Sequence, residues 1–538
     1  MKWFKNGKIY SETGQFHDSM LVEKERIVKV GSLKECQKAF IGDDIIDLEG
    51  KTVIPGLIDS HLHFLMTAEY LSLLPITGVT SMNELLTRCA DYIEKNKLTD
   101  ADVLYSEGWN HTLFTDEKRV PDRYDLDRAS STVPIVLVRV DRHVMSLNTA
   151  ALKYFGLTNQ TRVDSGGELE VDEAGKLTGV LKETALDLVK AKLPEKNREE
   201  KKRLLIQTMA LANRYGITSM HTNDAKDNQI EETLSLYEEI ESNQQLSVRF
   251  YHQIWFNDGQ FLPSFLSGPY SFHKGSEWNR IGPIKYFIDG TLGSRTAALY
   301  EPYSDDASTC GIHTKSQETL NKEVKMAVDN GFQVITHGIG DRGIEMILDA
   351  YDYALDGSDN DLRLGINHMQ ITNYELIDRV AERDYLTYVQ PLFLEDDLPI
   401  LYDRIGKERA ETSYLFNSMK KKGVHQSFSS DAPIVSFNPF DTIQCAVTRN
   451  RLTNPLPVAF LPEEAMTVEE AVDAYTFEGA YASFKEDKKG RLKEGYLADF
   501  VILNEDIFTI KENTIRNVTV SATYVNGDAV YKEEDLGI

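Results

Sequence analysis

Residues 52–64 read TVIPGLIDSHLHF, an apolar run that ends in two histidines separated by one residue. Alternate side chains of a β-strand share a face, so His61 and His63 point the same way and could grip one metal ion. Two polar residues on a loop would have the same spacing. The rest of the chain therefore has to decide between a metal site and a loop.

Seven further short apolar runs follow, and helical patterns such as residues 374–383 lie between several of them. The runs cover residues 216–224, 246–255, 281–290, 331–340, 362–371, 385–393 and 424–433. Strands that alternate with helices indicate a parallel sheet. The fold class is therefore predicted to be α/β, with a (β/α)8 TIM-type barrel over residues 55–479.

The two ends of the chain have a different pattern. Residues 1–50 contain short alternating strands with turns, and Asn526-Gly527 near the other end is a strong hairpin signal between two β-rich runs. We expect residues 1–54 and 480–538 to build one accessory β-sandwich domain together.

About 150 residues separate the first barrel run from the second, far more than one crossover helix needs. We expect an insertion at residues 65–205 that covers the barrel mouth and selects the substrate, because loops at this end of a barrel line the active site. It contains an apolar run at residues 134–148 and a predicted surface hairpin at residues 164–179.

Composition limits the partners. The formal net charge of −26 disfavours binding to nucleic acid or an anionic membrane surface. Four scattered cysteines and the lack of any long apolar segment favour a reducing cytoplasm, with no membrane span. The expected partner is a small-molecule substrate, and a homodimer is one option that the sequence leaves open.

Metal-capable side chains end several other runs. His337 and His368 end the fifth and sixth runs, and Asp431 ends the eighth. Because imidazoles and a carboxylate converge on one mouth of a barrel, they form a site suited to zinc or a similar divalent ion. Lys285 ends the fourth run, and its ammonium would repel cations, so pairing with Asp289 is an equal alternative on the residues alone.

The order of these residues resembles the two-metal members of the amidohydrolase superfamily. The likeness runs nearly end to end. Within the superfamily, the chain resembles the YtcJ-like branch, which includes N-substituted formamide deformylases. The segments that carry it are PGLIDSHLHF, EGWN, RVDRHVMSLNTAAL, GVLKETA, KYFIDGTLGSRTAAL, THGIGDRGIEMILDAY, NHMQI and SSDAP. The tail GYLADFVILNEDIF with VTVSATYVNGDAVY resembles the superfamily's accessory β-sandwich.

The resemblance implies a binuclear metal centre and a role for each ligand. His61 and His63 would hold the buried ion, and His337 and His368 the more exposed one, with an N6-carboxylated Lys285 bridging two zinc ions. Asp431 would ligate the buried ion, take a proton from water and pass it to the leaving amine. Asn367 departs from the pattern, since relatives usually carry Glu before this histidine.

Further residues are expected to contact the substrate. They are Trp109, Asp141, His143, Asn148, Glu183, Asp289 and Arg295. His221 and His252 are taken to end the second and third runs and to lie on the barrel rim.

These patterns predict an amidohydrolase that cleaves a C–N bond other than a peptide bond, in a substrate such as an N-acyl or N-formyl amine. A cyclic-amide hydrolase or a deaminase on the same scaffold is an alternative, although such deaminases commonly lack the bridging lysine. A non-catalytic relative that has lost its metals would lack a ligand, and here all six positions are filled.

Overall fold

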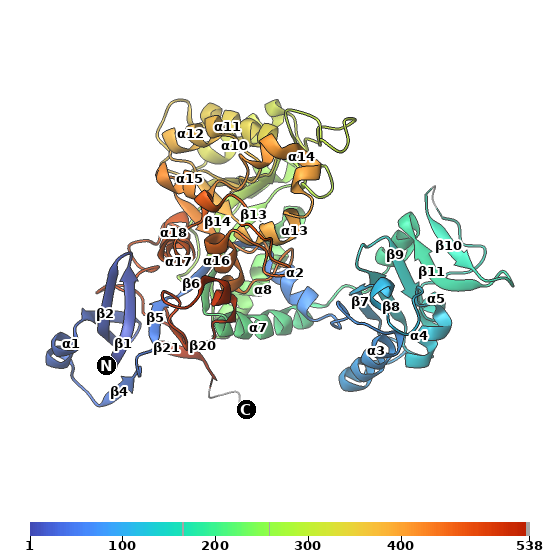
Figure 1. The fold of residues 1–538 in the computed structure, drawn as a ribbon, viewed down its shortest axis with the longest axis horizontal. Helices are drawn as coiled ribbons and strands as arrows, with labels where there is room; N and C mark the ends of the chain where they lie inside the picture. The colour runs from blue at the N-terminus through green and yellow to red at the C-terminus, as the bar shows by residue number, and fades with distance from the viewer. Residues whose placement is uncertain (164–165, 258, 534–538) are drawn as a thin grey trace. The chain divides into compact units, whose positions relative to one another are not determined.

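The computed structural model describes residues 1–163, 166–257 and 259–533. The chain divides into two compact units, one of Met1–Thr67 with Leu205–Ile538 and the other of Ala68–Leu204. The first unit contains a barrel and a sheet made from both chain ends, and Figure 1 labels their elements. The domain limits expected from the sequence stay predictions.

The first unit is built on eight parallel strands that follow the order of the predicted runs. They are β6 (Leu57–Leu62), β12 (Ile217–Lys226), β13 (Arg249–Trp255), β14 (Asn279–Phe287), β15 (Val334–Gly338), β16 (Gly365–His368), β17 (Leu386–Val389) and β18 (Gln426–Phe428). Each pairs with the next in parallel. The predicted TIM-type barrel is therefore confirmed.

The barrel is nearly closed, because the first strand meets the segment that follows the last one. The backbone N–H of Asp431 donates to the carbonyl of His61 at 2.8 Å, and that of His63 donates to Ala432 at 2.9 Å. Every residue of β6 is buried. Gly56 precedes β6 without a side chain, since a Cβ there would come within 2.3 Å of Oγ1 of Thr218 on β12.

Helices connect the barrel strands, and Figure 1 shows α10, α11 and α12 lying together along one side of the barrel. They are α7 (Arg198–Arg214), α8 (Ile230–Ser242), α9 (Leu262–Leu266), α10 (Gln317–Asp329), α11 (Asp341–Leu355), α12 (Tyr374–Glu382), α13 (Leu394–Asp397), α14 (Leu401–Ala410) and α15 (Phe416–Lys421), with α16 (Pro439–Thr448), α17 (Val468–Ala474) and α18 (Phe477–Ala482) after the last strand. In α12 the Asn373 side chain caps the first turn, and one face of the helix is buried.

The two chain ends form one eight-stranded sheet, as expected, and Figure 1 shows the blue and dark red strands side by side. Its strands are β1 (Lys2–Glu12), β2 (Gln15–Glu23), β3 (Arg26–Gly31), β4 (Asp44–Asp47), β5 (Thr52–Pro55), β19 (Phe500–Leu503), β20 (Val520–Val525) and β21 (Asp528–Lys532), with α1 (Leu33–Ala39) after β3. The rings of Phe500 and Tyr524 stack at 4.5 Å in its core. Its description as a sandwich stays a prediction.

The predicted hairpin turn at Asn526-Gly527 is confirmed. It joins the antiparallel strands β20 and β21, and the two residues have φ values of 53° and 75°. Positive φ at both central positions is the geometry that favours Asn-Gly in two-residue hairpins.

The second unit has its own five-stranded sheet, in the order β10-β11-β9-β8-β7. Its elements are α3 (Met82–Asn96), β7 (Leu104–Trp109), α4 (Arg123–Ala129), β8 (Ile135–Arg139), β9 (Val144–Leu147), α5 (Thr149–Tyr154), β10 (Glu168–Val171), β11 (Leu177–Lys182) and α6 (Asp187–Lys190), while α2 (Phe64–Leu71) precedes them. The predicted hairpin at 164–179 is present as β10 and β11, and residues 164 and 165 lie outside the described residues. The apolar run at 134–148 forms two antiparallel strands.

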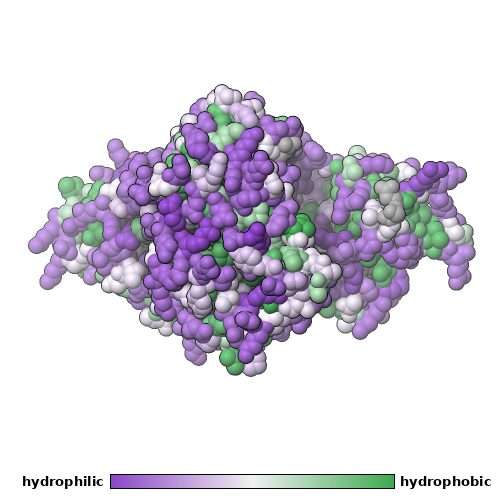
Figure 2. Space-filling model, turned by 90° about the horizontal axis from the view of Figure 1, so that it is seen from above, coloured by the Kyte–Doolittle hydropathy of each residue, from purple (hydrophilic) through white to green (hydrophobic). Residues whose placement is uncertain are grey.

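Surface and cysteine chemistry agree with the composition. The face seen in Figure 2 is mostly hydrophilic, with hydrophobic residues in small groups. No helix in the described part of the chain is long and apolar enough to cross a membrane. All four cysteines are free thiols, and three of them are buried.

Candidate metal centre

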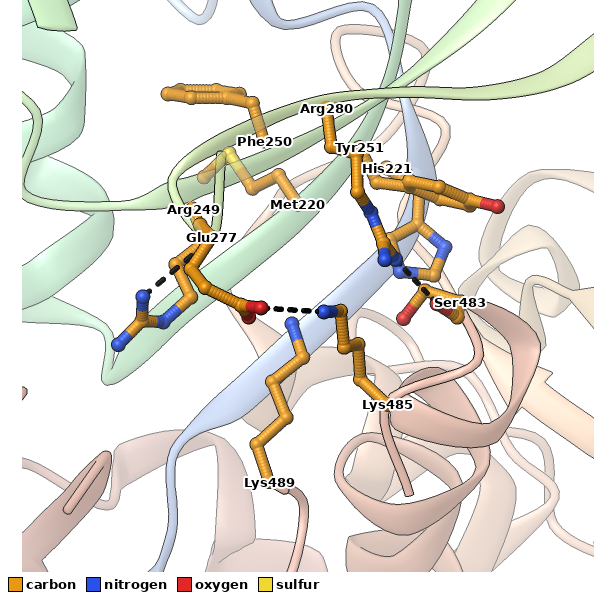
Figure 3. Close-up of a pocket in the computed structure, with 10 residues that line it drawn as sticks. All are labelled: Met220, His221, Arg249, Phe250, Tyr251, Glu277, Arg280, Ser483, Lys485 and Lys489. Carbon is orange, nitrogen blue, oxygen red and sulfur yellow. Dashed lines mark hydrogen bonds and ion pairs between the residues drawn. The ribbon is translucent and has the colours of Figure 1, made fainter. Parts of the chain in front are cut away.

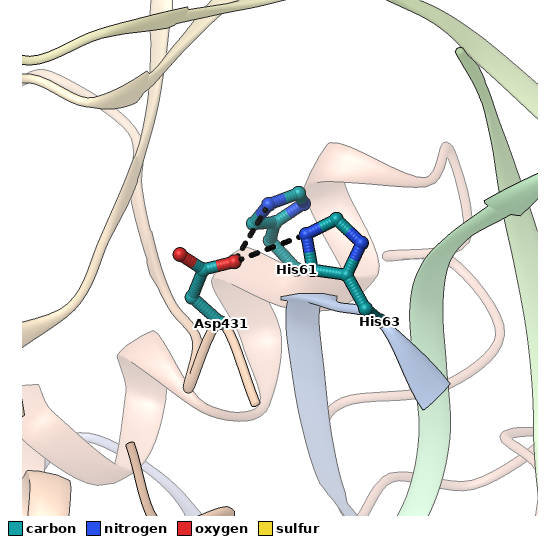
Figure 4. Close-up of side chains that lie close together, drawn as sticks. All are labelled: His61, His63 and Asp431. Carbon is teal, nitrogen blue, oxygen red and sulfur yellow. Dashed lines mark ion pairs between the residues drawn. The ribbon is translucent and has the colours of Figure 1, made fainter. Parts of the chain in front are cut away.

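Three metal-capable side chains meet at the carboxyl end of the barrel, and Figure 4 shows both imidazoles facing one carboxylate. Oδ1 of Asp431 lies 3.2 Å from Nε2 of His61 and 3.4 Å from Nε2 of His63. The three ligand atoms lie within 4.8 Å of one another, and all three residues are buried. This group could hold one metal ion.

Local structure fixes the carboxylate of this cluster. Asp431 has a φ of 54°, in the left-handed region that costs a non-glycine residue energy. One residue earlier, the Ser430 hydroxyl donates to the buried carboxylate of Asp59 at 2.5 Å. Because Asp59 lies on β6 beside the two histidines, it fixes the segment that carries Asp431 against them.

The outer nitrogen of each cluster histidine is already in a hydrogen bond. Nδ1 of His61 donates to Oε1 of Gln253 at 2.6 Å, and Nδ1 of His63 donates to the carbonyl of Asn223 at 3.1 Å. A ring nitrogen that donates leaves the other one with a free lone pair. Both Nε2 atoms that face Asp431 are therefore in the ligand form.

Two more histidines lie beside this cluster. The rings of His337 and His368 are 4.4 Å apart, and His368 is 6.1 Å from the ring of His61. Nε2 of His337 donates to the carbonyl of Gly290 at 3.1 Å, and Nδ1 of His368 donates to Oε1 of Gln390 at 2.7 Å. His337 therefore keeps a free lone pair on Nδ1, whereas the lone pair of His368 is on Nε2, which faces the amide of Asn367.

Asn367 changes the surroundings of His368. Its side-chain Nδ2 donates to Nε2 of His368 at 2.9 Å, which is the lone pair that a second ion would need. His368 itself has a φ of 80°, so its backbone is strained. The amide of Asn367 competes with a metal ion for this nitrogen.

Lys285 is fully buried on β14, and its Nζ has no hydrogen-bond partner among the described residues. Burial lowers the pKa of Lys285 to about 7. The expected alternative, an ion pair with Asp289, is not formed in the described part of the chain. Asp289 instead accepts hydrogen bonds from the backbone N–H groups of Ala298, Ile339 and Gly340.

The electrostatics of the cluster favour a neutral His61 and an ionised Asp431. For His63, burial lowers the pKa, but the hydrogen bond and charge of Asp431 outweigh it and raise the pKa above its usual value. Burial, with the charge of Lys285, lowers the pKa of His61 to about 4. Burial opposes ionisation of Asp431, yet its contacts with His61 and His63 hold the pKa of Asp431 well below its usual value. Neutral histidine and ionised aspartate are the protonation states that bind a metal.

The expected substrate residues on the barrel have structural partners. The Asp289 carboxylate is buried, and its Oδ1 lies 3.3 Å from Nε2 of His337, so it also orients a candidate ligand. Arg295 makes a two-pronged ion pair with Asp305, with both distances at 2.9 Å. Contact of either residue with a substrate stays a prediction.

The remaining expected substrate residues lie in the second unit. Trp109 is fully buried in its core, and the Asn148 amide caps α5 and donates to the carbonyls of Ser130 and Val133. His143 and Glu183 are exposed and form a 2.8 Å pair. Asp141 pairs with Arg139. Their relation to the substrate stays a prediction.

The expected rim position of His221 and His252 is wrong. Strand β12 continues past His221 to Lys226 and β13 past His252 to Trp255, so both side chains lie within the strands. They are exposed by only 1% and 0%. The third run ends with β13 at Trp255, but both histidines lie several residues before the ends of their strands.

The sequence reasoning missed Gln253 and Gln390, which orient His61 and His368. Each stands near the end of a predicted run, at a position equivalent to the ligands. This position near the end of a run is the sequence feature from which the two glutamines could have been found.

The fold is a TIM-type barrel. Its histidine and aspartate cluster lies at the carboxyl ends of the strands, where such barrels have their active sites, and forms a candidate metal site. The profile of the amidohydrolase family matches residues 44–531, and this chain belongs to that family. The resemblance drawn from the motifs is thereby confirmed.

Relatives and a solved structure cover nearly the whole chain. The YtcJ protein of Bacillus subtilis (strain 168), whose name assigns it to the amidohydrolases, is 31% identical over 98% of both chains. The N-substituted formamide deformylase of Arthrobacter pascens is 27% identical over 96% of this chain and 95% of its own. The structure of an uncharacterized metal-dependent hydrolase from Pyrococcus horikoshii OT3 has a TM-score of 0.76 and 25% identity, with coverage of 95% of this chain and 99% of that one.

Proposed function

We propose that this protein is a metal-dependent hydrolase that cleaves the C–N bond of an amide-type small molecule, such as an N-acyl or N-formyl amine. Family membership and the likeness to an N-substituted formamide deformylase support this substrate class. The observation that carries the proposal is the orientation of four histidines. Each ring donates one N–H to an oxygen atom and has its lone pair on the other nitrogen, for which Asn367 competes in His368 alone.

The cluster fits zinc. Zinc bonds to nitrogen and oxygen of about 2.0–2.1 Å give a tetrahedron with edges of about 3.3 Å. The distances from Oδ1 of Asp431 to the two Nε2 atoms, 3.2 and 3.4 Å, agree with such edges. His61, His63 and Asp431 would hold this ion, and imidazole with carboxylate suits zinc.

Lys285 would complete a binuclear centre after carboxylation. A neutral amine attacks carbon dioxide, a new N–C bond forms as one C=O π bond opens, and the nitrogen releases one proton. This leaves a carbamate whose single negative charge is shared by two oxygens. A lysine whose pKa is lowered to about 7 supplies that neutral amine at physiological pH. Its buried and unpartnered Nζ fits this role, with His337 and His368 as the remaining ligands.

A bound divalent ion would polarise the scissile carbonyl and lower the pKa of the nucleophilic water. Asp431 would accept the proton from that water and deliver it to the nitrogen of the leaving amine. Its ionised state and buried position suit it to that transfer. The C–N bond then breaks, and an acid and an amine are released.

We further propose that His143, Glu183 and Asp141 contact the substrate. The exposed pair His143 and Glu183, with Asp141, offers polar groups for this purpose. We expect His143→Ala and Glu183→Gln to change the preference among amides without changing metal content. Equal loss for every substrate, or loss of metal, would argue against the idea. Tyr124→Ala, an exposed residue on the same unit, serves as control.

The test of the function begins with a metal count on protein purified without chelator. A screen of N-formyl, N-acetyl and cyclic amides follows. Two ions per chain with turnover of acyclic amides would support the proposal. Turnover restricted to cyclic amides would replace the substrate class, and a metal-loaded protein that hydrolyses no amide would refute it.

The same assay tests Lys285. Lys285→Ala should lose activity and at least one ion, and short carboxylic acids with bicarbonate should partly restore both, since they supply anionic oxygens. Lys315→Ala, which removes a buried lysine paired with Glu323, should keep its metals. Two ions and near-native turnover in Lys285→Ala would show that Lys285 has no part in the centre.

A further inference from the structure

A small cavity lies at the amino ends of the barrel strands, at the opposite end from the metal cluster. Its volume is about 20 Å³. Figure 3 shows Arg280 reaching from β14 toward Ser483 and His221, while Lys485 and Lys489 project from the segment after α18. The function proposed above gives this cavity no role.

The lining of the cavity has an excess of positive charge. Arg249, Arg280, Lys485 and Lys489 line it, against the single carboxylate of Glu277. Glu277 pairs with Lys485 at 2.8 Å, and Arg249 pairs with Asp499, which lies outside the lining, at 2.8 Å. Among the described residues, Arg280 and Lys489 have no carboxylate within ion-pair distance. Two positive charges are therefore left without a counter-charge.

These two cations are poorly solvated. Lys489 is 8% exposed, and its Nζ donates to Oγ of Ser219 at 2.8 Å. Arg280 donates to the carbonyl of Ser483 at 2.5 Å. Burial, with the charge of Arg249, lowers the pKa of Lys489 to about 7, and burial also lowers the pKa of Arg280. Buried charges without partners cost free energy, so a counter-ion in the cavity would be stabilising.

His221 adds an unused donor. It is 1% exposed and lines the cavity, and neither of its ring nitrogens has a hydrogen-bond partner among the residues that the structure describes. Buried polar side chains are nearly always hydrogen-bonded, so an orphaned imidazole indicates a missing ligand. One ring N–H of His221 can donate to that ligand.

The volume limits what fits. A cavity needs about 10–15 Å³ to hold one water molecule, so 20 Å³ accommodates one water or one monatomic ion and excludes phosphate or a carboxylic acid. We propose that this cavity binds one halide ion of the size of chloride, held by Arg280, Lys489 and His221. A neutral water would leave Arg280 uncompensated and Lys489 partly deprotonated, whereas an anion would keep Lys489 charged.

Such an ion would link the segment after α18 to the amino ends of the barrel strands. Arg280 and His221 belong to β14 and β12, whereas Lys489 belongs to the segment that leads from α18 to β19 of the accessory sheet. An anion shared by these residues joins that segment to the barrel strands. Its effect is on stability, since it lies at the opposite end of the barrel from the metal cluster.

The experiment uses the full-length protein crystallised with sodium bromide in place of chloride. A bromine anomalous peak between Arg280, Lys489 and His221 supports the site. In solution, the thermal midpoint should rise saturably with chloride, by about 2 °C or more relative to gluconate at equal ionic strength. Bromide peaks on the surface with none in the cavity, an adventitious ion only, would overturn the proposal, as would a water in the cavity.

Variants separate this site from general salt effects. Arg280→Met and Lys489→Met should each lose the chloride-dependent shift. Lys488→Met should keep it, because Lys488 is a partly exposed cation of the same segment that pairs with Glu277 and lies outside the lining. If Arg280→Met and Lys489→Met fail to fold, the bromide peak and the saturable shift of the unmodified protein decide. A shift that Arg280→Met and Lys489→Met retain would overturn the site.

Discussion

Nδ2 of Asn367 lies 2.9 Å from Nε2 of His368, so an amide occupies the lone pair that its neighbour would offer to a second metal ion. In the described part of the chain, no amide competes for the facing nitrogens of the cluster formed by His61, His63 and Asp431. The two halves of the proposed centre therefore differ in how readily they take up an ion.

Asn367→Ala should strengthen binding of the second ion. One hydrogen bond contributes about 0.5–1.5 kcal/mol net, so the affinity should rise about two- to tenfold. Titration of the metal-free protein with zinc, followed by calorimetry, measures this. His368→Ala should remove the second binding event and so identify it. Weaker binding in Asn367→Ala would mean that Asn367 supports the ion instead of competing with it.

Gln253→Leu should weaken binding of the first ion. Gln253 fixes the orientation of the His61 ring through a 2.6 Å hydrogen bond, and it also donates to the carbonyl of Ser60. Loss of such an outer partner typically costs about 10–100-fold in metal affinity. The zinc dissociation constant, measured by competition with a chelating dye, checks this.

Gln333→Leu is the matched control for Gln253→Leu. Gln333 is a buried barrel amide that donates to the carbonyls of Arg363 and Ala482. Its replacement should lower stability and leave the zinc affinity unchanged. Equal zinc affinities in both variants and the unmodified protein would show that ring orientation does not need Gln253.

The positions of the candidate ligand residues could be predicted from the sequence because each ends an apolar run. In a parallel barrel, the carboxyl ends of the strands meet at one mouth. His61, His337 and Asp431 could therefore be assigned to one site from the sequence alone. The same reasoning failed for His221, where the strand extends beyond the apolar run to Lys226. Hydrophobicity marks the buried part of a strand but not its end.

The hydrogen-bond partners of these residues could not be predicted from the sequence, for a different reason. Lys285 and Asp289 are four residues apart, a spacing that left an ion pair open. Asp289 instead accepts hydrogen bonds from the backbone N–H groups of Ala298, Ile339 and Gly340, which belong to two other segments. Such choices depend on three-dimensional neighbours. The orientation of His61 by Gln253, from another strand, is the same case.

Asp499→Asn should destabilise the first unit. Asp499 and Arg249 form a buried ion pair at 2.8 Å that joins the segment before β19 to β13. Removing one partner of a buried pair typically costs about 3–5 kcal/mol. Urea unfolding followed by tryptophan fluorescence measures the change. Asp329→Asn, which breaks an exposed pair with Lys325, should change stability by less than about 0.5 kcal/mol.

The same pair predicts a pH dependence. Burial raises the pKa of Asp499, but the charge and hydrogen bonds of Arg249 outweigh it and hold this pKa below its usual value of 3.8. A carboxyl with a lowered folded pKa stabilises the protein above the unfolded pKa and loses this contribution as pH falls through the folded value. The stability advantage over Asp499→Asn should therefore shrink below about pH 4. An advantage that is constant from pH 7 to pH 3 would contradict this.

Asp431→Asn should nearly stop hydrolysis while His61 and His63 still bind an ion, although more weakly. The amide keeps the shape of the side chain and one oxygen for coordination, but it cannot accept the proton of the nucleophilic water. Proton transfer by a placed side chain contributes about 10²–10⁴-fold, so kcat should fall by at least that range, and the altered ligand adds to the loss. Turnover and metal content are measured on the same preparation.

Asp397→Asn controls for the loss of a half-buried carboxylate on α13 of the same unit. Asp397 accepts hydrogen bonds from Gln370 and Tyr414 and is outside the metal cluster, so its replacement should leave metal content unchanged. If Asp431→Asn retained its metals and hydrolysed amides within about tenfold of the unmodified protein, a proton-transfer contribution of the size given above would be excluded. Asp431 would then act as a ligand alone, and the proton would have to leave through another group.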